Sequence, residues 1–186
     1  MAHTVCADQS TLILIDLQER LMPMIDRGAA VLQEALFLGH TAQILGVPII
    51  GTEQNPRGLG PNSQEIQALC VDTLSKMHFD ACKDGLLNHI QPARKQVVLA
   101  GCEAHVCLLQ TAMGLISASF EVFVVAQACG SRSAMDHALA MQRLGLAGAK
   151  IISPEMLVFE WLDSCEHQRF KDVLNTIKRR PSGGFA

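Results

Sequence analysis

The stretch from Val97 to Thr111, VVLAGCEAHVCLLQT, decides how this chain folds and where its chemistry lies. An apolar run, Val97 to Ala100, breaks at Gly101, and a helix-like segment then extends from Cys107 to Ile116. A continuous apolar run followed by a turn and a helix is typical of a buried strand in a parallel sheet. Cys107 is therefore expected between the carboxyl end of a strand and the amino end of a helix, where open parallel sheets bind ligands.

Cys107 is a candidate nucleophile. The unpaired N–H groups at the start of a helix favour a thiolate, which is the reactive form of cysteine. The plainer alternative is a small buried apolar residue, which is how a free cysteine usually behaves. The position after a glycine-broken strand favours the catalytic interpretation.

Length and composition predict one well-buried domain. The chain has 186 residues, and 49% of them are hydrophobic, which is enough for a full core. We expect a single domain over residues 1–186, with its core at about residues 10–171 and a solvated, flexible tail at residues 179–186.

Charge and cysteine usage narrow the class of function. The net charge is −3, and the only basic run is Lys178 to Arg180, so nothing favours nucleic acid or an anionic membrane. No apolar stretch approaches the ~20 residues that a membrane-spanning helix needs. Seven cysteines without a CxxC pair or a secretory signal are typical of a reducing compartment. We expect a cytoplasmic protein that binds a small molecule.

Short β-rich runs alternate with amphipathic helical stretches. Strands are predicted at Thr11–Ile15, Val47–Gly51, Leu74–Met77, Gln96–Ala100, Glu121–Ala126 and Lys150–Ile152. Helices are predicted at Ala29–Leu45, Ala81–His89, Cys107–Ile116 and Ser133–Leu144, with a final one opened by Ser153 and Pro154 and a long loop at Gly58–Pro61. This alternation predicts a three-layer, Rossmann-like α/β fold, with a mostly parallel sheet of about six strands covered by helices on both faces.

Polar residues that follow the predicted strands should meet at one edge of the sheet. Asp16 closes an apolar strand, where a carboxylate is costly to desolvate without a partner. It could accept the thiol proton and return it to a leaving amine. Lys76 lies among apolar residues, and a cation beside Cys107 would lower the pKa of the thiol. The plainer alternatives are a loop-capping aspartate and a lysine that snorkels from an edge strand.

Five motifs occur in order along the chain. They are LILIDLQERL (Leu12–Leu21), GVPIIGTEQNPRGLGP (Gly46–Pro61), SKMHF (Ser75–Phe79), GCEAHVCLLQTA (Gly101–Ala112) and ACGSRS (Ala128–Ser133). On these motifs the chain resembles the isochorismatase-like family of cysteine hydrolases, which includes nicotinamidases and carbamoylsarcosine amidohydrolases. The resemblance extends from about Ser10 to about Lys171, and it is strongest to the branch of isochorismatase domain-containing proteins.

The resemblance implies a catalytic triad of Asp16, Lys76 and Cys107. It also implies a cis peptide between Cys102 and Glu103, and an oxyanion hole made by the backbone N–H groups of Glu103 and Cys107. The implied reaction is hydrolysis of a small amide, carbamoyl or related C–N substrate through a thioester, without a cofactor and in a homo-oligomer. Cys107 argues against the isochorismatase reaction itself, which in that family cleaves a vinyl ether without a cysteine nucleophile.

No metal site is expected, although nicotinamidases hold a metal after the second strand. The corresponding loop here has Glu53 as its only carboxylate and no histidine, and no histidine pair in the chain has HxH or HExxH spacing. Candidate residues of the substrate pocket are Gln18, Glu53, Gln54, Phe79 and His105, together with Thr52 and His78, and all of them rank below the triad.

Two other classes of function stay open at this point. The chain could be a binding or scaffold protein that keeps the fold without turnover, because fold alone does not establish activity. It could also be a thiol redox-responsive protein in which Cys102 pairs with Cys107, provided that their Cα atoms lie within ~7 Å. The presence of all three triad residue types favours the hydrolase.

Overall fold

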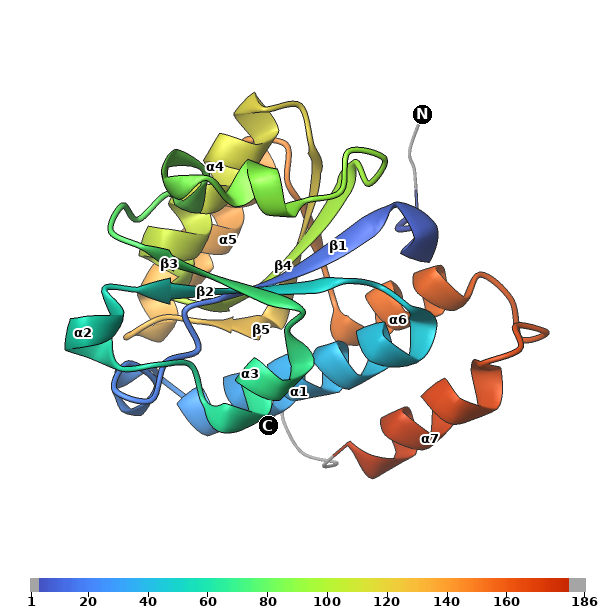
Figure 1. The fold of residues 1–186 in the computed structure, drawn as a ribbon. Helices are drawn as coiled ribbons and strands as arrows, with labels where there is room; N and C mark the ends of the chain where they lie inside the picture. Colours follow the sequence, from blue (N-terminus) through green and yellow to red (C-terminus); the bar gives the residue numbers. More distant parts are fainter. Residues whose placement is uncertain (1–3, 181–186) are drawn as a thin grey trace.

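A six-stranded parallel sheet forms the centre of the molecule in a computed structural model that describes residues 4–180 (Figure 1). The strands are β1 (Ser10–Ile15), β2 (Ile49–Gln54), β3 (Asp72–Lys76), β4 (Gln96–Cys102), β5 (Glu121–Gly130) and β6 (Lys150–Ile152). Their order across the sheet is β3-β2-β1-β4-β5-β6, and each neighbouring pair is parallel. The predicted α/β fold is confirmed.

Helices cover both faces of the sheet (Figure 1). One face carries α1 (Gly28–Leu45), α3 (Gln64–Leu69), α6 (Pro154–Leu162) and α7 (Phe170–Arg179). The other carries α4 (Leu109–Ser117), α5 (Ala134–Leu146) and the 3₁₀ turns η3 (Ala81–Asp84) and η4 (Leu86–His89). Successive side chains of a strand point to opposite faces, so Leu12 and Leu14 pack under α1 while Ile13 and Ile15 pack under α4.

The structure corrects several predicted elements. A short helix, α2 (Pro56–Leu59), with proline in its first turn, includes the first two residues of the predicted loop at Gly58–Pro61, and α3 follows the loop. The predicted helix Ala81–His89 is instead the two turns η3 and η4, because Gly85 between them has a φ of 97° and ends the first. β2 begins and ends later than predicted.

The carboxyl-terminal region also differs from the prediction. The helix opened by Ser153 and Pro154 is not the last, because α7 follows it. Arg179 ends α7, and Arg180 is not a solvated tail residue: its guanidinium pairs with Glu34 at 2.7 Å and lies 5.1 Å from the centre of the Phe37 ring. The rest of the predicted tail, residues 181–186, lies outside the described residues.

The carboxyl ends of the central strands approach each other unusually closely at Gly101. A Cβ atom at this position would lie 2.1 Å from the carbonyl oxygen of Ile15, and the φ of Gly101 is 125°. Only glycine fits there. Its small size lets the end of β4 lie against the end of β1, which places Asp16 beside the turn that follows β4.

Candidate active site

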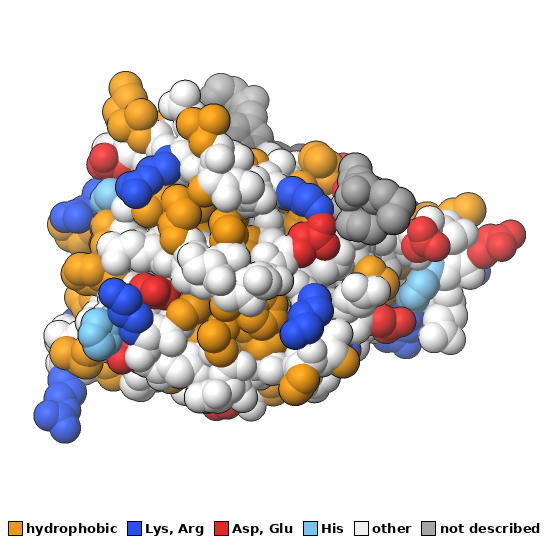
Figure 2. Space-filling model, turned by 90° about the horizontal axis from the view of Figure 1, so that it is seen from above, with side chains coloured by type: hydrophobic (Ala, Val, Ile, Leu, Met, Phe, Trp, Pro, Cys, Tyr) orange, Lys and Arg blue, Asp and Glu red, His pale blue; other side chains and the backbone are white. Residues whose placement is uncertain are grey.

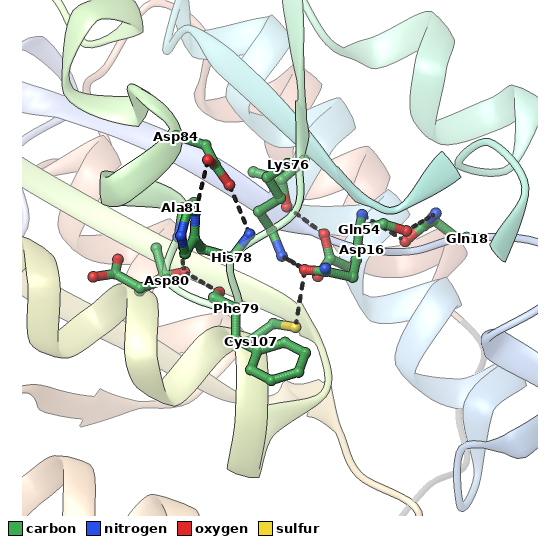
Figure 3. A network of polar contacts seen from close by, with 12 residues as sticks. Asp16, Gln18, Gln54, Lys76, His78, Phe79, Asp80, Ala81, Asp84 and Cys107 are labelled. Atoms are coloured by element: carbon green, nitrogen blue, oxygen red, sulfur yellow. Dashed lines mark hydrogen bonds and ion pairs between the residues drawn. The ribbon is translucent and has the colours of Figure 1, made fainter. Parts of the chain in front are cut away.

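The structure brings the three predicted catalytic residues together from distant parts of the chain. Asp16 follows β1, Lys76 ends β3, and Cys107 lies in η5 (Ala104–Leu108), a short π-helical turn that leads into α4. Lys76 Nζ lies 2.8 Å from Asp16 Oδ2, and both side chains are completely buried. Figure 3 shows the three side chains converging. The sheet order makes this possible, because β2 alone separates β1 from β3.

Asp16 is held by partners on both carboxylate oxygens. The Thr52 hydroxyl donates a hydrogen bond to Oδ1 at 2.6 Å, and Lys76 donates to Oδ2. Thr52 thus orients the carboxylate, whereas the sequence suggested a contact with substrate. A buried ion pair needs such additional hydrogen bonds to offset the desolvation of its charges.

The Cys107 thiol is protonated in the resting site. Its pKa is raised from 9.0 to about 12, because burial and the nearby Asp16 carboxylate both raise it and the Lys76 ammonium only partly opposes them. The expectation that Lys76 and the helix start make Cys107 a thiolate is therefore wrong, because desolvation is the larger effect. A base must remove the thiol proton before the sulfur can attack.

The turn after β4 has the expected cis peptide between Cys102 and Glu103. The Glu103 carbonyl accepts hydrogen bonds from the amides of Val106 and Leu108, each at 3.1 Å, and the Cys107 amide lies between these two in sequence. The Glu103 carboxylate is 2.6 Å from the guanidinium of Arg132, in the loop between β5 and α5. The oxyanion hole made by Glu103 and Cys107 stays a prediction.

Two of the five pocket candidates brace a loop instead of facing open space. Gln18 is fully buried, and its side-chain amide bonds to both the N–H and the carbonyl of Gln54, at 2.9 and 3.0 Å. Glu53 accepts a hydrogen bond from the Asn62 amide at 2.8 Å. Gln18 thus holds the end of β2, and Glu53 holds the segment that follows it.

The other candidates lie differently. Gln54 reaches into the site, with its side-chain oxygen 2.7 Å from Lys76 Nζ. The Phe79 side chain is about half exposed. His105 Nδ1 is 3.0 Å from the Ser131 hydroxyl. His78, another candidate, is exposed and pairs with Asp84 at 2.9 Å.

Sequence reasoning did not single out Ser131 and Arg132 as individual residues. Together they join the loop after β5 to the turn after β4, through His105 and Glu103 respectively. The available signal was their place in the ACGSRS motif, at the carboxyl end of a strand that neighbours β4. That is the edge of the sheet where sites form.

The sequence of this chain matches a known protein family. The family model called isochorismatase domain matches residues 10–156. The chain belongs to the isochorismatase family. It is 37% identical to isochorismatase domain-containing protein 1 of Danio rerio over 91% of this chain, and 34% identical to isochorismatase domain-containing protein 2A of Mus musculus over 94%. The matches span 61% of the zebrafish protein and 85% of the mouse protein.

Solved structures agree with this family assignment. A protein called MAR1 ribonuclease, from Caenorhabditis elegans, has a TM-score of 0.89 and 29% identity, with 99% of this chain and 97% of that chain covered. The YcaC gene product of Escherichia coli, described as an octameric hydrolase of unknown specificity, has a TM-score of 0.83 and 21% identity over 96% of this chain and 97% of its own. The second likeness concerns the fold alone.

The geometry of this isochorismatase domain also bears on metal and disulfide chemistry. Within residues 4–180, no three His, Cys, Asp or Glu side chains are grouped as metal ligands. All seven cysteines are free. Cys102 packs on the α1 face of the sheet, with its sulfur 3.7 Å from that of Met22, whereas Cys107 packs on the α4 face. This arrangement disfavours a redox pair between Cys102 and Cys107.

Proposed function

We propose that this protein is a cysteine hydrolase that cleaves a small amide, carbamoyl or related C–N substrate through a thioester. Membership of the isochorismatase family and a fold neighbour described as a hydrolase support hydrolysis in general. One observation carries the finer assignment: a buried Asp16–Lys76 ion pair lies against a protonated Cys107 at the carboxyl edge of the sheet. A thiol of this kind needs a base beside it, and Asp16 is that base.

The first half of the reaction forms the acyl-enzyme. Asp16 takes the thiol proton of Cys107 while the sulfur attacks the substrate carbonyl carbon, and Lys76 stabilises the negative charge that moves between them. The backbone N–H groups of Glu103 and Cys107 bind the oxyanion, and each such donor contributes ~3 kcal/mol to transition-state stabilisation. Asp16 then gives its proton to the departing nitrogen, and a thioester remains.

The second half regenerates the enzyme. Water enters where the amine left, and Asp16 removes a proton from it as it attacks the thioester carbon. The carbon–sulfur bond breaks, the carboxylic acid leaves, and the proton on Asp16 returns to Cys107. The cycle consumes one water and leaves both side chains in their starting protonation states.

The test combines intact mass with ammonia release for the wild type, Cys107→Ala and Cys165→Ala. Each is incubated with a panel of small primary amides, ureas and carbamoyl compounds. We expect adduct and ammonia from the wild type and from Cys165→Ala, which removes an exposed thiol, and neither from Cys107→Ala. An equal adduct on all three proteins, or no adduct and no turnover across the panel, would contradict the proposal and favour a binding protein.

RNA belongs in the same panel, because a similar protein is called a ribonuclease. The net charge of −3 favours a small molecule over a polyanion, so we propose that RNA is not cleaved. RNA cleavage that disappears in Cys107→Ala would overturn the proposed substrate class.

We further propose a cytosolic homo-oligomer. Free thiols throughout the described chain suit a reducing compartment, and no helix within residues 4–180 is long and apolar enough to cross a bilayer. The E. coli neighbour is described as octameric, and α5 exposes Met135, Leu139 and Leu146. Figure 2 shows hydrophobic side chains exposed on the face of the molecule that is seen from above. Light scattering that gives a monomer's mass would contradict the assembly.

A further inference from the structure

Hydrogen bonds hold both the backbone and the side chain of Gln54 in place. It is the last residue of β2, and Gln18 holds its backbone on both sides with hydrogen bonds of 2.9 and 3.0 Å. Gln18 is itself buried and bonded to the Gly60 carbonyl at 2.6 Å. The backbone from which the Gln54 side chain extends is therefore anchored on the edge of the sheet.

The orientation of the Gln54 amide group is fixed by charge and by hydrogen-bonding type. Its nitrogen donates to the Met77 carbonyl at 2.8 Å, and its oxygen accepts from the Lys76 ammonium at 2.7 Å. Turning the amide over would set its NH₂ group against a cation and its oxygen against a carbonyl, which neither partner allows. The oxygen must point into the site.

That oxygen faces the nucleophile. Cys107 Sγ lies 3.9 Å from Gln54 Oε1, and Figure 3 shows the contact between them. An amide oxygen can accept two hydrogen bonds. At Gln54, the Lys76 ammonium donates one of them, and the Cys107 thiol, which is a weak donor, faces the other position. When the thiol proton moves to Asp16, the second position loses its donor.

We propose that Gln54 is a specificity-determining residue whose side-chain oxygen accepts an N–H of the substrate at the reacting group. The inference rests on the proposed function and deepens it: primary and secondary amides and ureas fit, whereas esters and tertiary amides leave the oxygen unpaired. When Cys107 attacks the carbonyl carbon of an amide, the amide nitrogen comes within reach of the Gln54 side-chain oxygen, because that oxygen already faces the Cys107 sulfur. The N–H of the substrate then replaces the lost S–H.

Two alkylating probes, one with N–H groups and one without, test this. Iodoacetamide carries an NH₂ group, and N,N-dimethyl-iodoacetamide carries none. With either probe the Cys107 sulfur forms a bond to the CH₂ carbon, the carbon–iodine bond breaks and iodide leaves, while the thiol proton goes to Asp16 and on to solvent. The rate at Cys107 is measured at pH 9 by peptide mass mapping and divided by the rate of the same probe with 2-mercaptoethanol.

We expect the wild type to prefer the N–H probe by about tenfold after this correction, as is typical when a buried acceptor would otherwise lose its hydrogen bond. Gln54→Met keeps the length of the side chain without the acceptor, and its preference should fall to about one. Gln54→Glu keeps an oxygen there, and it should retain the preference while both rates fall. Gln43→Met, on the exposed side of α1, is the matched control and should behave as the wild type.

The outcomes separate this proposal from the proposed function. A wild-type ratio near one, or a Gln54→Met variant in which both rates change while the ratio does not, overturns the specificity role and leaves the nucleophile intact. A wild type whose Cys107 reacts with neither probe overturns the nucleophile, and this proposal with it. A wild-type ratio near one overturns the proposal even if Gln54→Met fails to fold. A third probe, methyl iodoacetate, lacks N–H groups without the two N-methyl groups, and a wild-type rate with it as high as with iodoacetamide, after the same correction, also overturns the proposal.

Discussion

Removal of the Lys76 ammonium should destabilise the protein strongly unless the Asp16 charge is removed with it. The two side chains form an ion pair of 2.8 Å with no exposure to solvent. In Lys76→Met the Asp16 carboxylate keeps the hydrogen bond from the Thr52 hydroxyl, at 2.6 Å, but loses its cationic partner. An unpaired buried charge is the main cost of this substitution.

The expected magnitude follows from that geometry. Breaking a buried pair by removing one partner costs about 3–5 kcal/mol of unfolding free energy, whereas replacing both partners by neutral groups of similar size costs much less. For a chain of this length, each kcal/mol lowers the melting temperature by about 2–4 °C. Lys76→Met should therefore melt roughly 10 °C below the wild type, and the double variant Asp16→Asn/Lys76→Met should recover about half of the loss or more.

The assay is a double-mutant cycle. Unfolding free energies come from urea denaturation followed by circular dichroism, for the wild type, both single variants and the double variant. The coupling free energy should be at least about 2 kcal/mol. Additive losses in the double variant, or a cost below about 1 kcal/mol for Lys76→Met, would refute the assignment of Asp16 and Lys76 as a charged and desolvated pair.

Three other predictions concern the same region. Thr52→Val should lower the unfolding free energy by about 1–3 kcal/mol, because it removes the donor to Asp16 Oδ1 while keeping the shape of the side chain; a melting temperature equal to the wild type's would contradict that hydrogen bond. The rate of Cys107 alkylation by iodoacetamide should keep rising between pH 7 and 10, because its pKa is about 12 and the reactive thiolate is the minor form throughout this range; a plateau below pH 8 would show a lowered pKa instead. Gly101→Ala should prevent folding, because its Cβ would lie 2.1 Å from the Ile15 carbonyl oxygen. The control Gly145→Ala, whose Cβ would lie 3.8 Å from its nearest neighbour, should fold normally. A soluble Gly101→Ala protein with a native-like circular dichroism spectrum would refute the close approach of β1 and β4.

Local interactions account for the elements that the sequence predicted well. Ser133 begins α5 as predicted, because its hydroxyl accepts a hydrogen bond from the Asp136 amide three residues later. Gly46 ends α1 as predicted, with a φ of 71° that few other residues adopt. The helices α2, α3 and α7 were missed. α2 and α3 have only four and six residues, and the apolar face of α7 packs on α1.

The sequence by itself determined which chemical groups reach the carboxyl edge of the sheet. An aspartate after β1, a lysine at the end of β3 and a cysteine after β4 could all be identified, because strand and helix patterns depend on neighbouring residues. The roles of Gln18 and Thr52 could not, since each depends on which side chain lies opposite across the fold.

Only the tertiary structure decided the state of these groups. It paired Asp16 with Lys76 across 60 residues of chain, and it buried Cys107 deeply enough to keep its thiol protonated, where the sequence favoured a thiolate. The physical reason is that desolvation and charge interactions depend on distances in space between segments that are far apart in the chain. The pattern of residues along the chain does not contain those distances.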